Sequence, residues 1–395
     1  MMLGMMNFFT PGFGLRPPLL AGREEALQTC GAGVQRILSG GAPDPVFISG
    51  LHGAGKTALL EAAQANARSQ GALTIVVAAR EGSPLFGALV GPLRAALARR
   101  IAPIANSPAG ERALSALASF AKTHARTATP GALEAVAGLA DTGDVETDAA
   151  ELLAAIAGAA ASEGSAAVLY VDDIERARLA EVSALCAALG QARAAGGQVA
   201  LVASGLSRSD ARAQEMAERL GPVSHVQLGA LPLQAAVVAL NAPAAAAGVK
   251  FTEQALSEII AGSGRHPFFL QQWAASALAL ATDPLIDRRA LERARRDIEA
   301  ELDVRFHGVV LAEATASEWG YLRAVAELGV AVAGTAETAA HLGMPMSAAA
   351  PIRASLIAKR VLYSPERGRA AFAAPGLGGY ILRAAGMARE PAPAT

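Results

Sequence analysis

The sequence lacks the features of a membrane or secreted protein. It has only two cysteines, Cys30 and Cys186, which match neither a disulfide pattern nor a metal-binding spacing, so we expect reduced, buried thiols. The uncharged stretch 230–249 is interrupted by two prolines and two side-chain amides, unlike a membrane-spanning helix. The amino terminus lacks the basic start, apolar centre and small-residue cleavage site of a signal peptide. These absences predict a cytoplasmic protein with no membrane partner.

The sequence also lacks an excess of charge of either sign. Lysine and arginine number 34 against 35 aspartates and glutamates, and this balance gives no overall attraction to nucleic acid. Any nucleic-acid binding must therefore depend on a local basic patch. Apolar residues make up 52% of the chain, and many of them are alanines, which favour helices. With 395 residues, the chain is long enough for two or three domains with a large core.

What the sequence does contain is a glycine-rich loop in "FISGLHGAGKTALLEAA", residues 47–63. Gly50 and Gly55 bracket four residues, and Lys56 and Thr57 follow at once. A short apolar run before the loop favours a buried strand, and an alanine- and leucine-rich segment after it favours a helix. This setting predicts a P-loop rather than a glycine-rich turn that happens to end in Lys-Thr.

A P-loop binds a nucleoside triphosphate through its backbone and two side chains. Inward-turned N–H groups form an anion nest, and the helix N-terminus adds partial positive charge. We expect Lys56 to reach the β- and γ-phosphates and the Thr57 hydroxyl to ligate magnesium. The sequence thus predicts ATP and Mg²⁺ as cofactors, held by Gly50, Gly53, Ala54, Gly55, Lys56, Thr57 and Ala58.

Two further polar positions follow predicted strands. Asp172 and Asp173 end the apolar run in "AAVLYVDDIERA"; we expect Asp172 to hold magnesium and Asp173 to act as general base toward water. The alternative is that both aspartates cap the next helix. Ser204 ends the following strand, where its hydroxyl would contact the γ-phosphate or the attacking water, or else form part of a Ser-Gly turn.

The pattern of elements predicts an α/β core followed by helical and mixed segments. Five apolar runs separated by helical segments indicate a parallel sheet covered on both faces, with several helices inserted over 81–165. The expected strands are 46–49, 73–79, 167–171, 199–203 and 225–228. The expected divisions are an extended arm (1–20), an ATPase core (21–230), a helical lid (231–302), a winged helix (303–390) and a tail (391–395).

The carboxy-terminal expectations depend on capping and turn signals. Thr252 and Asp287 are predicted N-caps in the helical segment, and Thr315 with Glu318 forms a predicted capping box. A helix, a tight turn, a second helix from residue 347 and a hairpin turning at 365–368 indicate the winged helix. Arg289, Arg293 and Arg296 share one predicted helix face, which is either solvated or in contact with phosphate or a partner.

With these motifs, the chain resembles a bacterial AAA+-type ATPase, and within that class the origin-recognition-like ATPases that overlap the STAND signalling NTPases. The resemblance covers nearly the whole chain. "PPLLAGREEAL" resembles the family's GRE box, which implies that Gly22, Arg23 and Glu24 lie near the adenine. Pro267 matches the lid's Gly-x-Pro contact, although Arg265 stands where the glycine would be. Arg219 falls where these proteins carry an arginine finger, or is an exposed surface arginine.

The resemblance implies an ATP-binding, slowly ATP-hydrolysing switch whose nucleotide state repositions the lid and the winged helix. In one reading, the winged helix binds DNA and the protein regulates transcription. In the other, it is a joint with weak, unspecific DNA binding, and the protein acts through an unknown protein partner or a homo-oligomer. Seven basic residues against Glu366 and Glu390 in 351–395 favour DNA contact: Arg353, Lys359, Arg360, Arg367, Arg369, Arg383 and Arg389. The apolar start of the second helix favours the joint.

Overall fold

The computed structural model describes residues 8–12, 14–98, 107–125, 135–206, 211–281 and 283–386. The tail 391–395 and Arg389 lie outside the described residues. Contacts within the chain define two compact units. The core unit contains Arg23–Gly50 and Gly55–Leu228. The C-terminal unit contains the segment up to Gly22, the short segment Leu51–Ala54 and the chain from Gly229 onward.

The core unit is built on a five-stranded parallel sheet in the order β2-β3-β4-β1-β5. Its strands are β1 (Val46–Gly50), β2 (Leu73–Ala78), β3 (Ala167–Asp172), β4 (Val199–Gly205) and β5 (Ser224–Leu228). These strands match the five predicted apolar runs. Almost every residue of β1, β3 and β4 is buried, as expected when helices cover both faces of a parallel sheet. The predicted α/β fold is confirmed.

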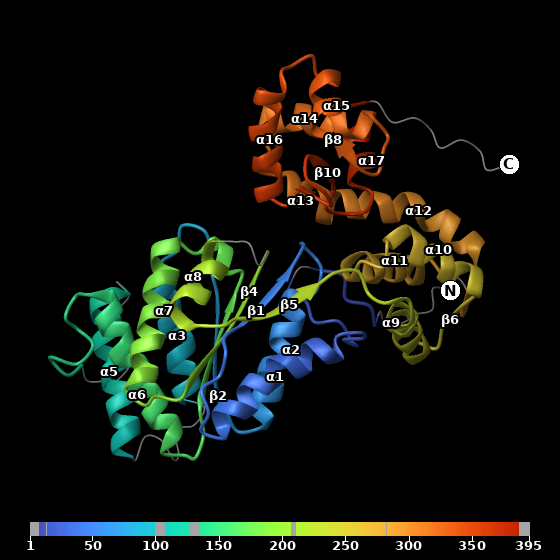
Figure 1. Cartoon of the computed structure of the whole chain (residues 1–395). Helices are drawn as coiled ribbons and strands as arrows, with labels where there is room; N and C mark the ends of the chain where they lie inside the picture. Colours follow the sequence, from blue (N-terminus) through green and yellow to red (C-terminus); the bar gives the residue numbers. More distant parts are fainter. Residues whose placement is uncertain are drawn as a thin grey trace. The chain divides into compact units, whose positions relative to one another are not determined.

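Helices cover both faces of this sheet. Figure 1 shows α1 and α2 on one face and α3, α6 and α7 on the other, while α5 packs against α3 and α6. The core-unit helices are α1 (Glu24–Leu38), α2 (Lys56–Ser69), α3 (Leu85–Ala98), α5 (Pro108–His124), α6 (Val145–Ala161), η1 (Ile174–Arg176), α7 (Leu179–Ala194) and α8 (Ala211–Leu220). The predicted insertion before the third strand therefore contains α3, α5 and α6.

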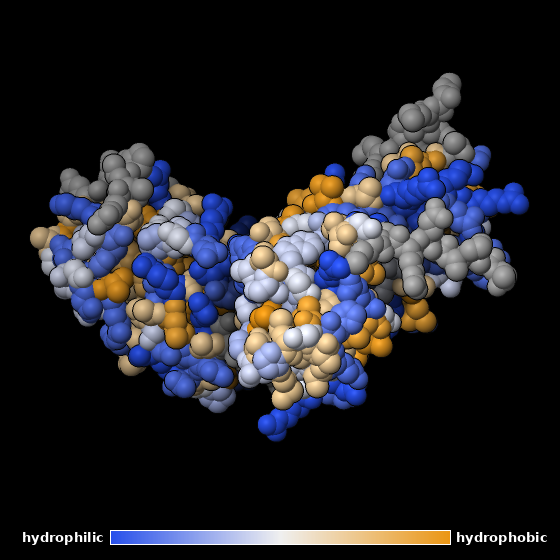
Figure 2. All heavy atoms as spheres, turned by 90° about the horizontal axis from the view of Figure 1, so that it is seen from above, coloured by the Kyte–Doolittle hydropathy of each residue, from blue (hydrophilic) through white to orange (hydrophobic). Residues whose placement is uncertain are grey.

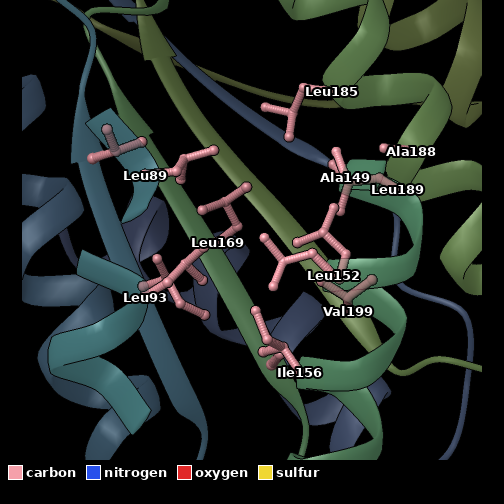
Figure 3. Packing of buried hydrophobic residues seen from close by; sticks show 14 of the residues in the cluster. Leu89, Leu93, Ala149, Leu152, Ile156, Leu169, Leu185, Ala188, Leu189 and Val199 are labelled. Carbon is pink, nitrogen blue, oxygen red and sulfur yellow. The ribbon is translucent and has the colours of Figure 1, made fainter. Parts of the chain in front are cut away.

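The buried face on the α6 side is filled by aliphatic side chains from both sheet and helices. Figure 3 shows Leu169 of β3 among Leu89 and Leu93 of α3 and Leu152 and Ile156 of α6. Leu169 is fully buried. Truncating such a leucine to alanine removes about 2–5 kcal/mol of stability in a packed core. This packing fixes the strand ends on which the polar residues stand.

The first half of the C-terminal unit is helical with one exception. Its helices are α9 (Leu233–Ala246), α10 (Glu253–Ser263), α11 (Pro267–Ala279) and α12 (Arg288–Leu302). The Thr252 and Asp287 side chains accept hydrogen bonds from backbone N–H groups at the starts of α10 and α12, which confirms both predicted caps. The expectation of helix throughout was wrong in one detail: β6 (Lys250–Phe251) and β7 (Leu285–Ile286) pair in parallel. Two-residue strands are too short to leave an apolar pattern in sequence.

Helix α12 continues without a break into a π-helical turn, η2 (Asp303–His307), and then into α13 (Gly308–Leu311). The rest of the unit has the order α14 (Ala316–Glu327), β8 (Ala333–Gly334), α15 (Thr335–His341), α16 (Met346–Ala358), β9 (Leu362–Tyr363), β10 (Arg369–Phe372) and α17 (Leu377–Ala384). The predicted helix–turn–helix and hairpin are present, the second helix begins one residue earlier than expected, and β8 adds a third strand beside β10. The Thr315–Glu318 capping box is confirmed.

The described part of the predicted arm has no helix or strand, but it is anchored. Phe9 is 3% exposed and its ring lies 6.5 Å from that of Phe251. The Thr10 backbone N–H donates to Gln271 Oε1 over 3.1 Å. This segment is therefore part of the packed C-terminal unit.

Exposed hydrophobic residues are scattered. Figure 2 shows them in small groups between hydrophilic residues on the face in view. Exposed large side chains include Leu233, Val304 and Met346, from separate elements. Among the described residues, none of the helices combines the length and hydrophobicity needed to span a lipid bilayer.

Candidate nucleotide site

The sheet order brings three polar strand ends together. β4 lies between β1 and β3 and pairs in parallel with both. The carboxyl ends of parallel strands face the same edge, so the P-loop after β1, Ser204 on β4 and Asp172 at the end of β3 are neighbours there. This edge is the candidate site.

The P-loop delivers Lys56 and Thr57 at the first turn of α2. Gly55 precedes the helix with a φ of +92°, a left-handed conformation that glycine adopts without strain. Lys56 is 7% exposed, and its Nζ donates to the carbonyl of Gly50 at the end of β1 over 3.0 Å. Ala54 and Ala58 are also buried, and the Ala54 backbone N–H donates to the Leu51 carbonyl over 3.2 Å.

Asp172 is the hub of the site. The Thr57 hydroxyl donates to Asp172 Oδ2 over 2.7 Å, and the Ser204 hydroxyl donates to Oδ1. The backbone N–H of Asp173 lies 3.1 Å from Oδ1 and 3.2 Å from Ser204 Oγ. A buried carboxylate held by three donors has a fixed orientation. The contact between Thr57 and Asp172 joins residues that are 115 positions apart in sequence.

Asp173 occupies a strained backbone position beside this hub. Its φ is +51°, uncommon for a residue other than glycine and often found at functional sites. Burial, and next the Asp172 carboxylate, raise the pKa of Asp173, although two nearby cations oppose this. Asp173 is the N-cap residue of η1, but its carboxylate makes no capping hydrogen bond there, and the Asp172 carboxylate accepts from other donors.

Ser204 is fully buried and lies within β4 together with Gly205. The alternative of a Ser-Gly turn was therefore wrong. Its hydroxyl contacts Asp172 and the backbone N–H of Asp173. The Ser204 side chain thus holds the two aspartates in place. The sequence analysis instead expected its hydroxyl to contact the γ-phosphate or the attacking water.

The residues present fit Mg²⁺ with a nucleotide. A hydroxyl and a carboxylate oxygen in contact are hard oxygen ligands of the kind that Mg²⁺ takes alongside phosphate oxygens. Within the described ranges, no cluster of three or more His, Cys, Asp or Glu side chains is arranged to hold a metal by itself. Phosphate oxygens would therefore complete the coordination.

The residues expected near the adenine lie in both units. Gly22 has a φ of +68°, and a Cβ there would lie 2.5 Å from that of Ala235 and 3.2 Å from Pro232 Cδ. Arg23 is 8% exposed, and burial lowers its pKa. Pro267 is the first residue of α11, as its fixed φ favours. Arg265 has a φ of +60°, in the left-handed region that favours glycine.

Arg219 is not brought to this edge. It lies in the last turn of α8, exposed, and its guanidinium Nε is 2.5 Å from Glu215 Oε1 one turn earlier. The hydrogen bond that Arg219 donates to Glu215 raises the pKa of Arg219. Both readings of this residue, a finger supplied to another subunit and a surface arginine, stay open.

The structure adds contacts to the loop tip, Leu51–Ala54, that sequence reasoning missed. His266 Nε2 donates to the His52 carbonyl over 2.9 Å, and the Phe268 backbone N–H donates to the Gly53 carbonyl over 3.3 Å. The only signal in the sequence was the position of His266 directly before Pro267.

Several basic residues of the carboxy-terminal segment are occupied by internal contacts. Arg353 Nη2 donates to Ser364 Oγ over 2.7 Å and to the Arg369 carbonyl. Lys359 Nζ lies 2.8 Å from Glu318 Oε2, and Arg383 lies 2.7 Å from Asp303. The exposed residues of α16 are short or apolar, such as Met346 and Ala350. Three of the seven basic residues that favoured DNA contact, Arg353, Lys359 and Arg383, are therefore engaged by neighbouring groups of the C-terminal unit.

Comparison with protein families gives two matches. Residues 19–202 match the model described as "AAA ATPase domain", a span just under half of the chain. Residues 304–381 match a model described as "Domain of unknown function (DUF8462)". A comparison with curated proteins gives no match.

Several solved structures are similar at low identity. The Orc1 protein of Aeropyrum pernix in complex with DNA is 16% identical, with coverage of 93% of this chain and 94% of that chain and a TM-score of 0.46. The Thermotoga maritima RuvB Holliday junction branch migration motor is 15% identical, with coverage of 96% and 100% and a TM-score of 0.46. Cdc6p from Pyrobaculum aerophilum is 14% identical, with coverage of 93% and 95% and a TM-score of 0.46. Similarity at this level is too low to indicate a shared activity.

The family match and the strand-end geometry agree on the core. Residues 19–202 are similar to the AAA ATPase domain, and they contain the P-loop, Asp172 and strands β1, β2 and β3. This similarity supports ATP binding and ATP hydrolysis in general.

Proposed function

We propose that the chain binds Mg-ATP at the carboxyl edge of the core sheet and hydrolyses it slowly. The contact between the Thr57 hydroxyl and Asp172 Oδ2 carries this proposal, because it places two magnesium ligands side by side at the start of the P-loop helix. Lys56 and the N–H groups of Gly53–Ala58 would hold the phosphates. Bound Mg²⁺ would neutralise phosphate charge during transfer.

Asp173 is the proposed general base. Its carboxylate follows Asp172 directly and is partly exposed, at 37% of the side chain, so water has access to it. The raised pKa makes it a stronger base than an ordinary aspartate. Ser204 is proposed to act through Asp172 and Asp173 as a positioning residue, and Arg219 as a finger supplied in trans within a homo-oligomer.

We further propose that the chain is a switch of the AAA+/STAND type. Its proposed parts are a core (21–230), a lid (231–302) containing Pro267, and a winged helix (303–390). Gly22 and Arg23 would lie on the adenine side. Nucleotide binding would shift the lid and winged helix by differential affinity for two arrangements.

The second candidate is a nucleotide-dependent DNA-binding regulator. The contacts of Arg353, Lys359 and Arg383 within the C-terminal unit favour the joint, since they engage three of the seven cations that could otherwise bind phosphates. DNA binding, if any, would be weak and unspecific, and output would pass to a protein partner.

The test is nucleotide binding by the full chain with and without the P-loop lysine. Lys56→Ala should weaken binding of a fluorescent ATP analogue by about 100-fold, since charge-assisted hydrogen bonds to phosphate are worth roughly 1.5–3 kcal/mol each. Lys122→Ala, an exposed lysine on α5, is the control and should bind as wild type. Equal affinity of the wild type and Lys56→Ala would refute the proposed site.

A further inference from the structure

The tip of the P-loop is held by residues far away in sequence. Leu51–Ala54 group with the C-terminal unit, unlike the residues on either side of them. Two consecutive carbonyls, of His52 and Gly53, accept hydrogen bonds from His266 Nε2 and the Phe268 backbone N–H. A carbonyl can only accept, so His266 carries a proton on Nε2. Both donors lie at the start of α11.

Gly53 is packed so closely that no side chain would fit there. A Cβ would lie 2.7 Å from His266 Cε1, 2.9 Å from Phe268 Cβ and 3.0 Å from Phe306 Cε2. Its φ of +72° also favours glycine. The loop tip is therefore seated against three side chains, those of His266, Phe268 and Phe306.

Phe306 connects this seat to the π-helical turn η2. It is 1% exposed, and its ring lies 5.0 Å from Phe268 and 5.8 Å from His266. The next residue, His307, is also buried; its Nδ1 lies 2.9 Å from Asp303 Oδ1, and its Nε2 donates to the Pro375 carbonyl over 3.0 Å. π-helical turns are rare and often mark functional sites. Here the turn places two consecutive rings in contact with different parts of the unit.

We propose that His266, supported by Phe306, is a positioning residue for the P-loop, and that η2 links this seat to the segment before α17 through His307. The tip is joined by peptide bonds to Gly50 and Gly55, so fixing the tip restricts the backbone whose N–H groups face the phosphates. The effect of these contacts on nucleotide affinity rests on the proposed function, whereas the contacts at the loop tip can be tested without nucleotide.

The first experiment is hydrogen–deuterium exchange on the full chain without nucleotide. In His266→Ala, amides of residues 50–58 and of Phe268 should exchange at least about 3-fold faster, because the loop opens locally more often. His266→Gln should restore wild-type exchange, since its amide N–H can still donate to the His52 carbonyl. The control is His341→Ala, an exposed histidine of the same unit that pairs with Glu327 and should leave the loop unchanged.

The second experiment is affinity for a fluorescent ATP analogue. Losing one neutral hydrogen bond corresponds to roughly 3- to 10-fold weaker binding in His266→Ala, with recovery in His266→Gln. Phe306→Leu should weaken binding in the same direction, and combining it with His266→Ala should give a non-additive effect, as for residues in contact.

The outcomes separate this inference from the proposed function. Unchanged exchange at the loop in both His266→Ala and Phe306→Leu would overturn the seat. Binding that Lys56→Ala abolishes but His266→Ala leaves intact would overturn the positioning role while the nucleotide site stands. If the wild type binds no nucleotide, the proposed function fails and the exchange result alone decides the seat.

Discussion

Polar residues are used differently at the strand-end site and in the carboxy-terminal domain. At the site, the hydroxyls of Thr57 and Ser204, which come from two different elements, both donate to the carboxylate of Asp172 on a third. In the domain, Lys359 pairs with Glu318 and Arg383 with Asp303. The first arrangement gathers oxygen ligands and a nearby cation at one edge. The second neutralises its charges internally. The basic residues of this segment are thus divided: Lys359 and Arg383 are paired with acids, whereas Arg367 and Arg369 are exposed.

The largest expected effect is the loss of ATP turnover when the proposed general base, Asp173, is removed. Asp173→Asn should lower ATP turnover roughly 10²–10⁴-fold, the usual contribution of a positioned acid or base, while nucleotide affinity stays near wild type. Phosphate release and binding of the ATP analogue, measured on the same preparations, would show whether turnover falls while affinity is unchanged. Asp141→Asn, an exchange in a loop of the core unit, is the control. Turnover retained in Asp173→Asn would remove Asp173 from the mechanism.

The next largest effect is expected from the ion pair between buried Glu318 and Lys359 in the C-terminal unit. Burial alone would raise the pKa of Glu318, but hydrogen bonds from Lys359, Ser355 and Thr315 lower it from 4.5 to about 2. A lowered acid pKa gives stability that is present above about pH 4.5 and lost as pH falls toward 2, on the order of 3 kcal/mol.

Glu318→Gln should therefore reduce the free energy of unfolding by about 2–3 kcal/mol at pH 7, with the difference from wild type shrinking below pH 4.5. Urea unfolding followed by Trp319 fluorescence in a Trp273→Phe background measures this. Glu327→Gln breaks a more exposed pair and should cost less than about 1 kcal/mol. A pH-independent difference for Glu318→Gln would contradict the assignment.

A smaller effect should follow from removing the hydroxyl behind Asp172. Ser204→Ala leaves every proposed magnesium ligand in place but removes one of the three donors to the Asp172 carboxylate, and such supporting hydrogen bonds are typically worth 10–100-fold in metal affinity. Magnesium titration of analogue binding should show a higher Mg²⁺ requirement and little change in affinity at saturating Mg²⁺. Weaker binding by the same factor at every Mg²⁺ concentration would instead assign Ser204 to the nucleotide.

The smallest effect is expected for DNA. Arg353 is held by Ser364 and the Arg369 carbonyl, so Arg353→Ala should change affinity for duplex DNA by less than about 2-fold, with any binding fading steeply as salt rises. Arg367→Ala, an exposed arginine in the hairpin turn, is the matched comparison. A footprint at physiological salt that disappears only with Arg353→Ala would favour the regulator over the joint.

Sequence patterns predicted the elements of the core well because their signals are local. Apolar runs predicted all five strands, and the glycines around Lys56 placed the loop between β1 and α2. Caps at Thr252, Asp287 and Thr315 were also predicted, since a cap involves residues only three positions apart. Short elements such as β6 and the turn η2 were missed because a few residues carry no periodicity.

The sequence by itself determined the α/β class, the P-loop and the acidic strand end, because strand burial, loop flexibility and helix starts depend on neighbouring residues. Only the tertiary structure decided that Ser204 supports Asp172, that Arg353 and Lys359 are occupied internally, and that His266 and Phe306 hold Gly53. Each of these contacts joins segments between 11 and 253 positions apart, where register, sheet order and packing choose the partner and no local pattern encodes it.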